Sequence, residues 1–115
     1  MTEALKLPVL EQPPASERPI QKQNVSVREG LKVVRLFVRA GHVVPEHHSN
    51  VDVVVTVVRG EGRFTVEGDE RPIAAGGVVV MRPGARHAIA AATDLELVVV
   101  HARLAGGGEA AGCGA

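Results

Sequence analysis

Apolar and polar residues alternate along the middle of the chain. In residues 32–39, Val34, Leu36 and Val38 fall on every second position, the period of a strand with one buried face. Similar segments recur at intervals of about 8 to 12 residues, separated by glycine-containing turns such as Gly68-Asp69. No window shows apolar positions at helical spacing. The pattern predicts an all-β fold, an antiparallel β-barrel or jelly roll, with strands over residues 25–29, 32–39, 51–58, 63–67, 71–74, 78–81, 87–91 and 95–103.

The two ends of the chain differ from this middle part. Residues 1–24 hold four of the seven prolines, including Pro13-Pro14, which predicts an extended N-terminal arm without a core of its own. Residues 105–115 are rich in glycine and alanine and are expected to be a flexible tail. The folded unit is therefore predicted to span residues 25–104.

Residues 51–58 are apolar on both faces of the predicted strand. The odd-numbered valines from Val51 to Val57 share one face, while Val54 and Val58 lie on the other. A strand of this kind is usually covered on both sides, and so small a folded unit has little chain left for the second cover. We expect a homodimer that buries Val54 and Val58. The alternative is a valine-rich chain that simply exposes some of its valines.

Composition and charge exclude several partners. The 115 residues include 13 basic and 13 acidic side chains, so the chain lacks the basic surface that nucleic acid or an anionic membrane requires. No run approaches the roughly 18 apolar residues of a membrane span, and no signal-peptide pattern is seen. The single cysteine, Cys113, has no internal disulfide partner and is expected to be an idle thiol. We therefore expect a cytoplasmic protein.

Two segments carry the residues with chemistry. The first is GHVVPEHHS at positions 41–49, followed by GEG at 60–62, and the second runs from Gly76 to RPGARH at 82–87. At this spacing, the pair resembles the two signature motifs of the cupin superfamily, over residues 31–104. The resemblance implies a small jelly-roll barrel, commonly dimeric, with a pocket at its mouth that often holds a divalent metal.

The resemblance also assigns the metal-ligand positions, and two of them are altered. These positions are His47, Ser49, Val53 and His87, with Ser49 in place of the second histidine and Val53 in place of the carboxylate. The family's topology implies that His47, on a strand opening at Pro45, meets His87 at one end of the barrel. The cofactor that this implies is a divalent metal (Zn, Fe, Mn or Ni), or otherwise none.

A third ligand has to come from elsewhere in the chain. His48 points away from His47 in a regular strand, but a β-bulge would bring it round. His42 would reach inward if the chain bends at Pro45. We expect His48 or His42 to complete a metal site, and the alternative is that each is an ordinary hydrogen-bonded polar residue. His101 shares its strand face with Leu97 and Val99 and is expected to face the interior.

Three functions are consistent with these residues. The first is a small-molecule-binding cupin whose apolar pocket has His47 and His87 as polar anchors, with or without a metal. The second is a metal-dependent enzyme of oxygenase or isomerase type, and the third is a dimeric sensor or regulatory module. Arg82 and Arg86 flank His87, and they either bind an acidic group of the ligand or form a solvated rim.

Overall fold

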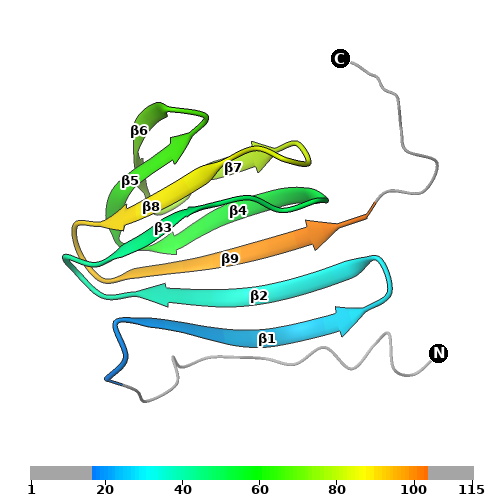
Figure 1. The fold of residues 1–115 in the computed structure, drawn as a ribbon. Helices are drawn as coiled ribbons and strands as arrows, with labels where there is room; N and C mark the ends of the chain where they lie inside the picture. The colour runs from blue at the N-terminus through cyan, green and yellow to red at the C-terminus, as the bar shows by residue number, and fades with distance from the viewer. Residues whose placement is uncertain (1–16, 104–115) are drawn as a thin grey trace.

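Residues 17–103 are described by the computed structural model, and they form antiparallel strands without a helix (Figure 1). The strands are β1 (Ile20–Arg28), β2 (Leu31–Val38), β3 (Val43–His47), β4 (Asp52–Arg59), β5 (Glu61–Val66), β6 (Asp69–Ala74), β7 (Val78–Met81), β8 (His87–Ala91) and β9 (Leu95–Ala102). None of the described residues belongs to a helix that could cross a membrane. The predicted all-β jelly-roll class is confirmed.

The strands make two sheets that face each other. The larger has the order β1-β2-β9-β4-β7 and the smaller β3-β8-β5-β6. Every pairing is antiparallel, and β9 returns to lie between β2 and β4. In Figure 1, β3 and β8 pass in front of β4 and β7. Strands that are distant in sequence, such as β3 and β8, therefore line the same space between the two sheets.

The core lies between these sheets and is built from alternate residues. The valines at positions 53, 55 and 57 of β4 are buried, as is Leu97 on β9, which is 0% exposed. Phe64 and Ile89 from the smaller sheet pack against them in the same cluster. Because valine and isoleucine fit a pleated surface, this composition favours the strands and fills the space between them.

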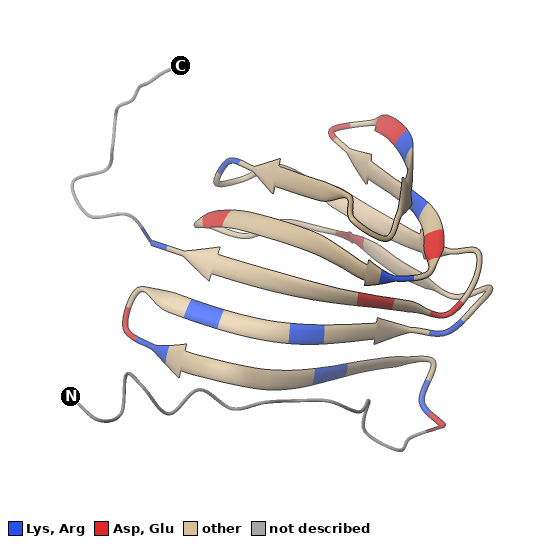
Figure 2. Cartoon of the chain, turned by 180° about the vertical axis from the view of Figure 1, so that it is seen from behind, with Lys and Arg blue, Asp and Glu red and all other residues tan. Residues whose placement is uncertain are grey.

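On the other face of the larger sheet, β4 and β7 expose apolar side chains. Val54 is half-buried, whereas Val58, Val78 and Val80 are exposed, Val80 by 71%. The alternation expected for residues 51–58 is therefore present. In Figure 2, β4 and β9 are tan over most of their length, with charged residues near their ends.

The folded part begins earlier than the predicted boundary at residue 25. β1 starts at Ile20, which pairs with Val38, and Lys22 pairs with Leu36. The first part of this strand shows no alternation of apolar and polar residues, because residues 21–24 are all polar. β1 is an edge strand with little to bury, so it does not need that alternation. Residues 1–16 and 104–115, with Cys113 among them, lie outside the described residues, so the rest of the predicted arm and the tail stay predictions.

Candidate functional site

A β-bulge in β3 turns His47 toward the space between the sheets. Val44 pairs with Ile89 and His47 with His87, so three steps along β3 match two along β8. The extra residue reverses the inward and outward alternation after Val44. Pro45 lies within this irregular stretch, where its missing N–H costs no ladder hydrogen bond. His47 therefore comes to lie directly across from His87.

The two imidazoles are in contact, and each is held by a hydrogen bond to a backbone carbonyl two residues earlier. Their ring centroids are 4.2 Å apart, with a tilt of 59° between the ring planes. His47 Nδ1 donates to the Pro45 carbonyl and His87 Nδ1 to the Ala85 carbonyl, each at 3.0 Å. Because a carbonyl oxygen only accepts, each ring carries a proton on Nδ1, and in the neutral tautomer with that proton Nε2 keeps a lone pair. Backbone bonds of this kind commonly orient metal-binding histidines.

His87 is the more buried of the pair. It is 6% exposed and packs near the Phe64 ring, whose centroid lies 6.1 Å away. Burial lowers the pKa of His87, and charge on His47 and His48 lowers this pKa further, against the opposing effect of the Ala85 hydrogen bond. The ring is therefore held in its neutral form at neutral pH.

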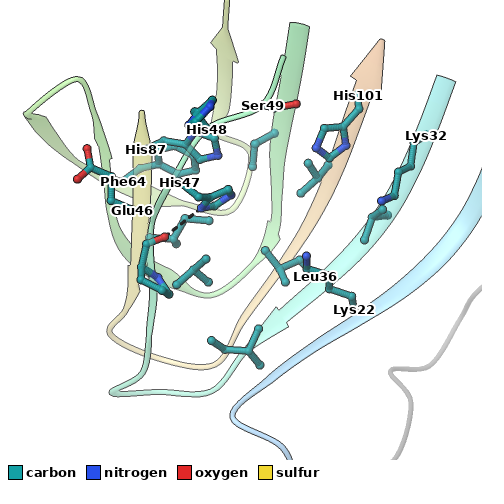
Figure 3. A pocket seen from close by; sticks show the side chains of 17 residues that line it. Lys22, Lys32, Leu36, Glu46, His47, His48, Ser49, Phe64, His87 and His101 are labelled. Carbon is teal, nitrogen blue, oxygen red and sulfur yellow. Dashed lines mark hydrogen bonds between the residues drawn. The ribbon is translucent and has the colours of Figure 1, made fainter. Parts of the chain in front are cut away.

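The histidine pair opens onto a cavity of about 350 Å³ between the two sheets (Figure 3). This volume is within the range of about 300 to 1,000 Å³ typical of small-molecule sites. Much of the wall is apolar, with side chains from both sheets. Its lining residues are Ile20, Lys22, Lys32, Val34, Leu36, Val44, Pro45, Glu46, His47, His48, Ser49, Val55, Phe64, His87, Ile89, Val99 and His101.

The other predicted site residues are placed differently from one another. His48 and Ser49 line the cavity, whereas His42 is an exposed residue outside its wall. Val53 is buried in the core. Within residues 17–103, no three His, Cys, Asp or Glu side chains gather closely enough to hold a metal ion. The structure does not bring His48 or His42 into a three-ligand group with the pair, and the role of either as a third metal ligand stays a prediction.

Three basic residues from the larger sheet also line the cavity, and two of them were not predicted as site residues from the sequence. These two are Lys22 on β1 and Lys32 on β2, and the third is His101 on β9. Lys32 shares its strand face with Val34 and Leu36, a signal that the alternation already contained. Lys22 gave no such signal, because its strand was assigned to the arm.

The His101 ring lies in a different electrostatic setting from the pair. Burial lowers its pKa, and the charges of Lys32 and Lys22 lower this pKa further, followed by those of His87 and His47. Its Nδ1 is buried and has no hydrogen-bond partner among the described residues. An unpaired buried nitrogen is costly, which makes His101 a candidate contact for a bound molecule.

Arg82 and Arg86 do not contribute to the cavity. Both are exposed and neither belongs to its wall. The Arg86 backbone N–H donates to the Glu67 carboxylate at 2.7 Å, which fixes the turn that precedes β8. Their exposed positions agree with a solvated rim, and binding of an acidic group of the ligand by these arginines stays a prediction.

Comparisons with known proteins agree with this architecture. A family model described as "Cupin domain" matches residues 34–102. Among curated proteins, no significant match is found. An RmlC-like cupin from Desulfovibrio desulfuricans has 29% identity and a TM-score of 0.73, with 82% of this chain and 92% of that chain covered.

Two further solved structures are similar to this chain. A cupin superfamily protein from Desulfitobacterium hafniense has a TM-score of 0.76 at 16% identity, covering 86% of this chain and 99% of that one. A predicted oxalate decarboxylase from Thermotoga maritima has a TM-score of 0.69 at 27% identity, covering 74% and 81%. At 16% identity, the likeness to the Desulfitobacterium hafniense protein shows a shared fold alone.

Proposed function

This chain belongs to the cupin family, and from that premise we propose that it binds a small molecule in the cavity between its sheets, with His47 and His87 as polar anchors. The observation that carries the proposal is the pair of contacting imidazoles on the wall of a largely apolar cavity. Apolar pockets with a few fixed polar groups are typical of small-molecule sites. With Nδ1 of each ring bonded to the backbone, the Nε2 atoms would hydrogen-bond a polar group on the ligand.

A neutral aromatic amide, 2-naphthamide, tests the proposal directly. The chain has no tryptophan or tyrosine, so naphthyl fluorescence is read without protein emission. We expect saturable binding to the wild-type protein and loss of binding in Val99→Phe, which fills the cavity. Val98→Phe is the matched control, since it places the same ring on the opposite face of β9.

The outcomes of this titration are distinct. Binding that survives Val99→Phe but disappears in Val98→Phe would place the probe on the outer face of the sheet and overturn the proposal. The absence of saturable binding in a folded wild-type protein would also overturn it. Far-UV circular dichroism of each variant establishes that the fold is retained.

A divalent metal at His47 and His87 is the second candidate. What favours it is the Nδ1 hydrogen bond of each ring, which leaves Nε2 as a potential ligand atom. The described residues offer these two ligands but no three-residue group, whereas a catalytic zinc site usually has three protein ligands. The donor set therefore does not fit a complete metal site, and we assign no reaction step to a metal.

Metal analysis of protein purified without a histidine tag tests this second candidate. Near-stoichiometric Zn, Fe, Mn or Ni that is lost in His87→Ala would favour the metal-dependent enzyme. A protein free of metal, with 2-naphthamide binding intact, would favour the binding protein.

We propose that a second copy of the chain covers the outer face of the larger sheet. The exposed Val58, Val78 and Val80 lie on this face, and the half-buried Val54 is paired with Val80 of β7 on one side and with Val100 of β9 on the other. A two-fold symmetric dimer brings the same patch together from both chains, and the zero net charge imposes little long-range repulsion. Such a dimer has twice the 12.0 kDa chain mass.

Light scattering at micromolar concentration tests the dimer. We expect Val54→Lys to shift the protein toward monomer, because a lysine charge buried without a partner is costly. Lys32→Glu leaves the outer face untouched and is expected to keep the wild-type mass. A wild-type mass equal to that of one chain would contradict the proposal.

A further inference from the structure

The cavity has two chemically different sides. His47 and His87 come from the smaller sheet, whereas Lys22, Lys32 and His101 come from three adjacent strands of the larger sheet. Lys32 pairs with His101 in register, so the two side chains lie side by side on the same face. Figure 3 shows the lysines and His101 together across the cavity from the histidine pair.

This second side carries positive charge without a matching carboxylate. Within residues 17–103, neither Lys22 nor Lys32 forms an ion pair. Among the described residues, Glu46 is the sole carboxylate on the cavity wall, and it belongs to β3 in the smaller sheet. Because the chain as a whole has no net charge, the excess here is local rather than a consequence of a basic protein.

Protection of a sheet edge explains one lysine but not the other. Lys22 lies on β1, an edge strand, where an inward-pointing lysine discourages pairing with another chain. Lys32 lies on β2, which is already paired on both sides with β1 and β9. Lys32 is exposed on the cavity wall, and protection of an edge does not account for its place there.

His101 supplies the second observation. Its Nδ1 is buried and unpartnered within the described part of the chain, although the ring borders a cavity. Burial lowers the pKa of this ring most, and the positive charges of Lys32 and Lys22 lower the pKa further. A bound negative group would pair with the lysines, accept a hydrogen bond from the imidazole and relieve this mutual repulsion.

We infer that Lys22, Lys32 and His101 form a subsite for the carboxylate of a small organic anion, whose apolar body occupies the cavity. The inference rests on the proposed function and adds the class of ligand. An apolar body is required because Val34, Leu36 and Val99 line the same side of the cavity as the cationic groups. The far end of the ligand then reaches the His47 and His87 imidazoles.

A pair of nearly isosteric probes tests the charge requirement. 2-Naphthoate and 2-naphthamide share the same ring system and differ mainly in the negative charge. We expect the wild-type protein to bind the carboxylate more tightly than the amide, with a preference that falls as KCl is added. Lys22→Met and Lys32→Met are expected to weaken 2-naphthoate binding by about threefold to fivefold each, the scale of partly solvated ion pairs.

The controls separate this subsite from general electrostatics. Arg28→Met removes the same unit charge from the exposed end of β1, outside the cavity wall, and is expected to leave 2-naphthoate binding unchanged. 2-Naphthamide binding is expected to stay within about twofold of wild type in both lysine variants, which also shows that they fold.

Failure of the subsite is distinguishable from failure of the proposed function. If 2-naphthamide binds but 2-naphthoate binds no more tightly, the carboxylate subsite is overturned and the binding cavity stands. Equal weakening by Arg28→Met and Lys32→Met would likewise overturn the subsite, because charge outside the cavity would then account for the preference. If neither probe binds the folded wild-type protein, the proposed function itself fails.

Discussion

Replacing Glu96 by glutamine is expected to destabilise the fold strongly. Glu96 and Arg35 are each 6% exposed, and Arg35 Nη2 lies 2.6 Å from Glu96 Oε2. Arg35 Nε also donates to the same oxygen at 3.2 Å. Glu96→Gln keeps the side-chain shape but leaves the Arg35 guanidinium buried without a negative partner. Breaking one side of a buried pair typically costs about 3 to 5 kcal/mol.

The lower end of that range applies here. Glutamine still offers one acceptor oxygen, and the Arg35 guanidinium retains the Phe37 ring, whose centroid is 5.1 Å from Cζ. We therefore expect a loss of about 3 kcal/mol in unfolding free energy. Since small domains are stable by about 5 to 15 kcal/mol, this loss would be plain in a urea titration.

Arg59→Gln is the matched control for Glu96→Gln. Arg59 Nη2 lies 2.8 Å from Glu96 Oε1, but the Arg59 side chain is 63% exposed. A pair with one solvated partner contributes about 0 to 1 kcal/mol. The double variant Arg35→Met/Glu96→Leu removes both buried charges together and is expected to fall within about 1 kcal/mol of wild type, or above it.

Urea unfolding followed by far-UV circular dichroism measures all four proteins. The absence of tryptophan and tyrosine makes backbone signal the appropriate probe, and the protein concentration is held fixed in case the dimer contributes. Similar small losses for Glu96→Gln and Arg59→Gln would refute the reasoning, because burial would then not decide the cost. A double variant as unstable as Glu96→Gln would refute the part played by the unpaired arginine.

Two further predictions concern packing and pH. A Cβ at Gly62 would meet the Ala90 carbonyl oxygen, so Gly62→Ala is expected to lower the unfolding free energy by about 1 to 3 kcal/mol in the same titration, and an unchanged midpoint would contradict this. Burial lowers the pKa of His87 in the folded protein below the ordinary histidine value of about 6.5. In acid, His87 therefore binds a proton more readily in the unfolded chain than in the folded one. The unfolding free energy is expected to fall as the pH drops from 7 toward 5. His87→Gln should flatten that profile, and an equally steep profile would assign the titration to another group.

The fold could be predicted from the sequence because alternation survives wherever a strand has one apolar face. β4 shows this most clearly, since its valines at 53, 55 and 57 are buried and Val58 is exposed. The first half of β1 could not be found in this way, because its polar residues at 21–24 are specified by pairing with β2, whereas its second half was predicted as the strand at 25–29. Edge strands that bury little leave little hydrophobic signal in a sequence.

The candidate site was predictable only in part, for a different reason. The two motifs pointed to His47 and His87, and the structure brings these rings into contact. The bulge that turns His47 inward depends on the pairing of β3 with β8, which no local pattern encodes. Lys22 was missed because its segment was assigned to the N-terminal arm. Lys32 could have been placed on the inner face, because it alternates with Val34 and Leu36, but the alternation does not show that a cavity lies there.

The residue changes in the motif alter which charge the cavity favours. Val53 stands where the resemblance places a carboxylate, and β4 pairs this valine with His101, which in turn pairs with Lys32. These three paired residues form a row across the sheet. Where the family pattern would place a negative group next to a metal, this row has the valine side chain of Val53, followed by the imidazole of His101 and the ammonium group of Lys32. A divalent cation beside His47 and His87 would face this positive row, and Glu46 is the one carboxylate that residues 17–103 place on the wall. An anionic ligand meets the opposite balance, because the same lysines attract it and no acidic residue of the larger sheet lines the cavity to repel it.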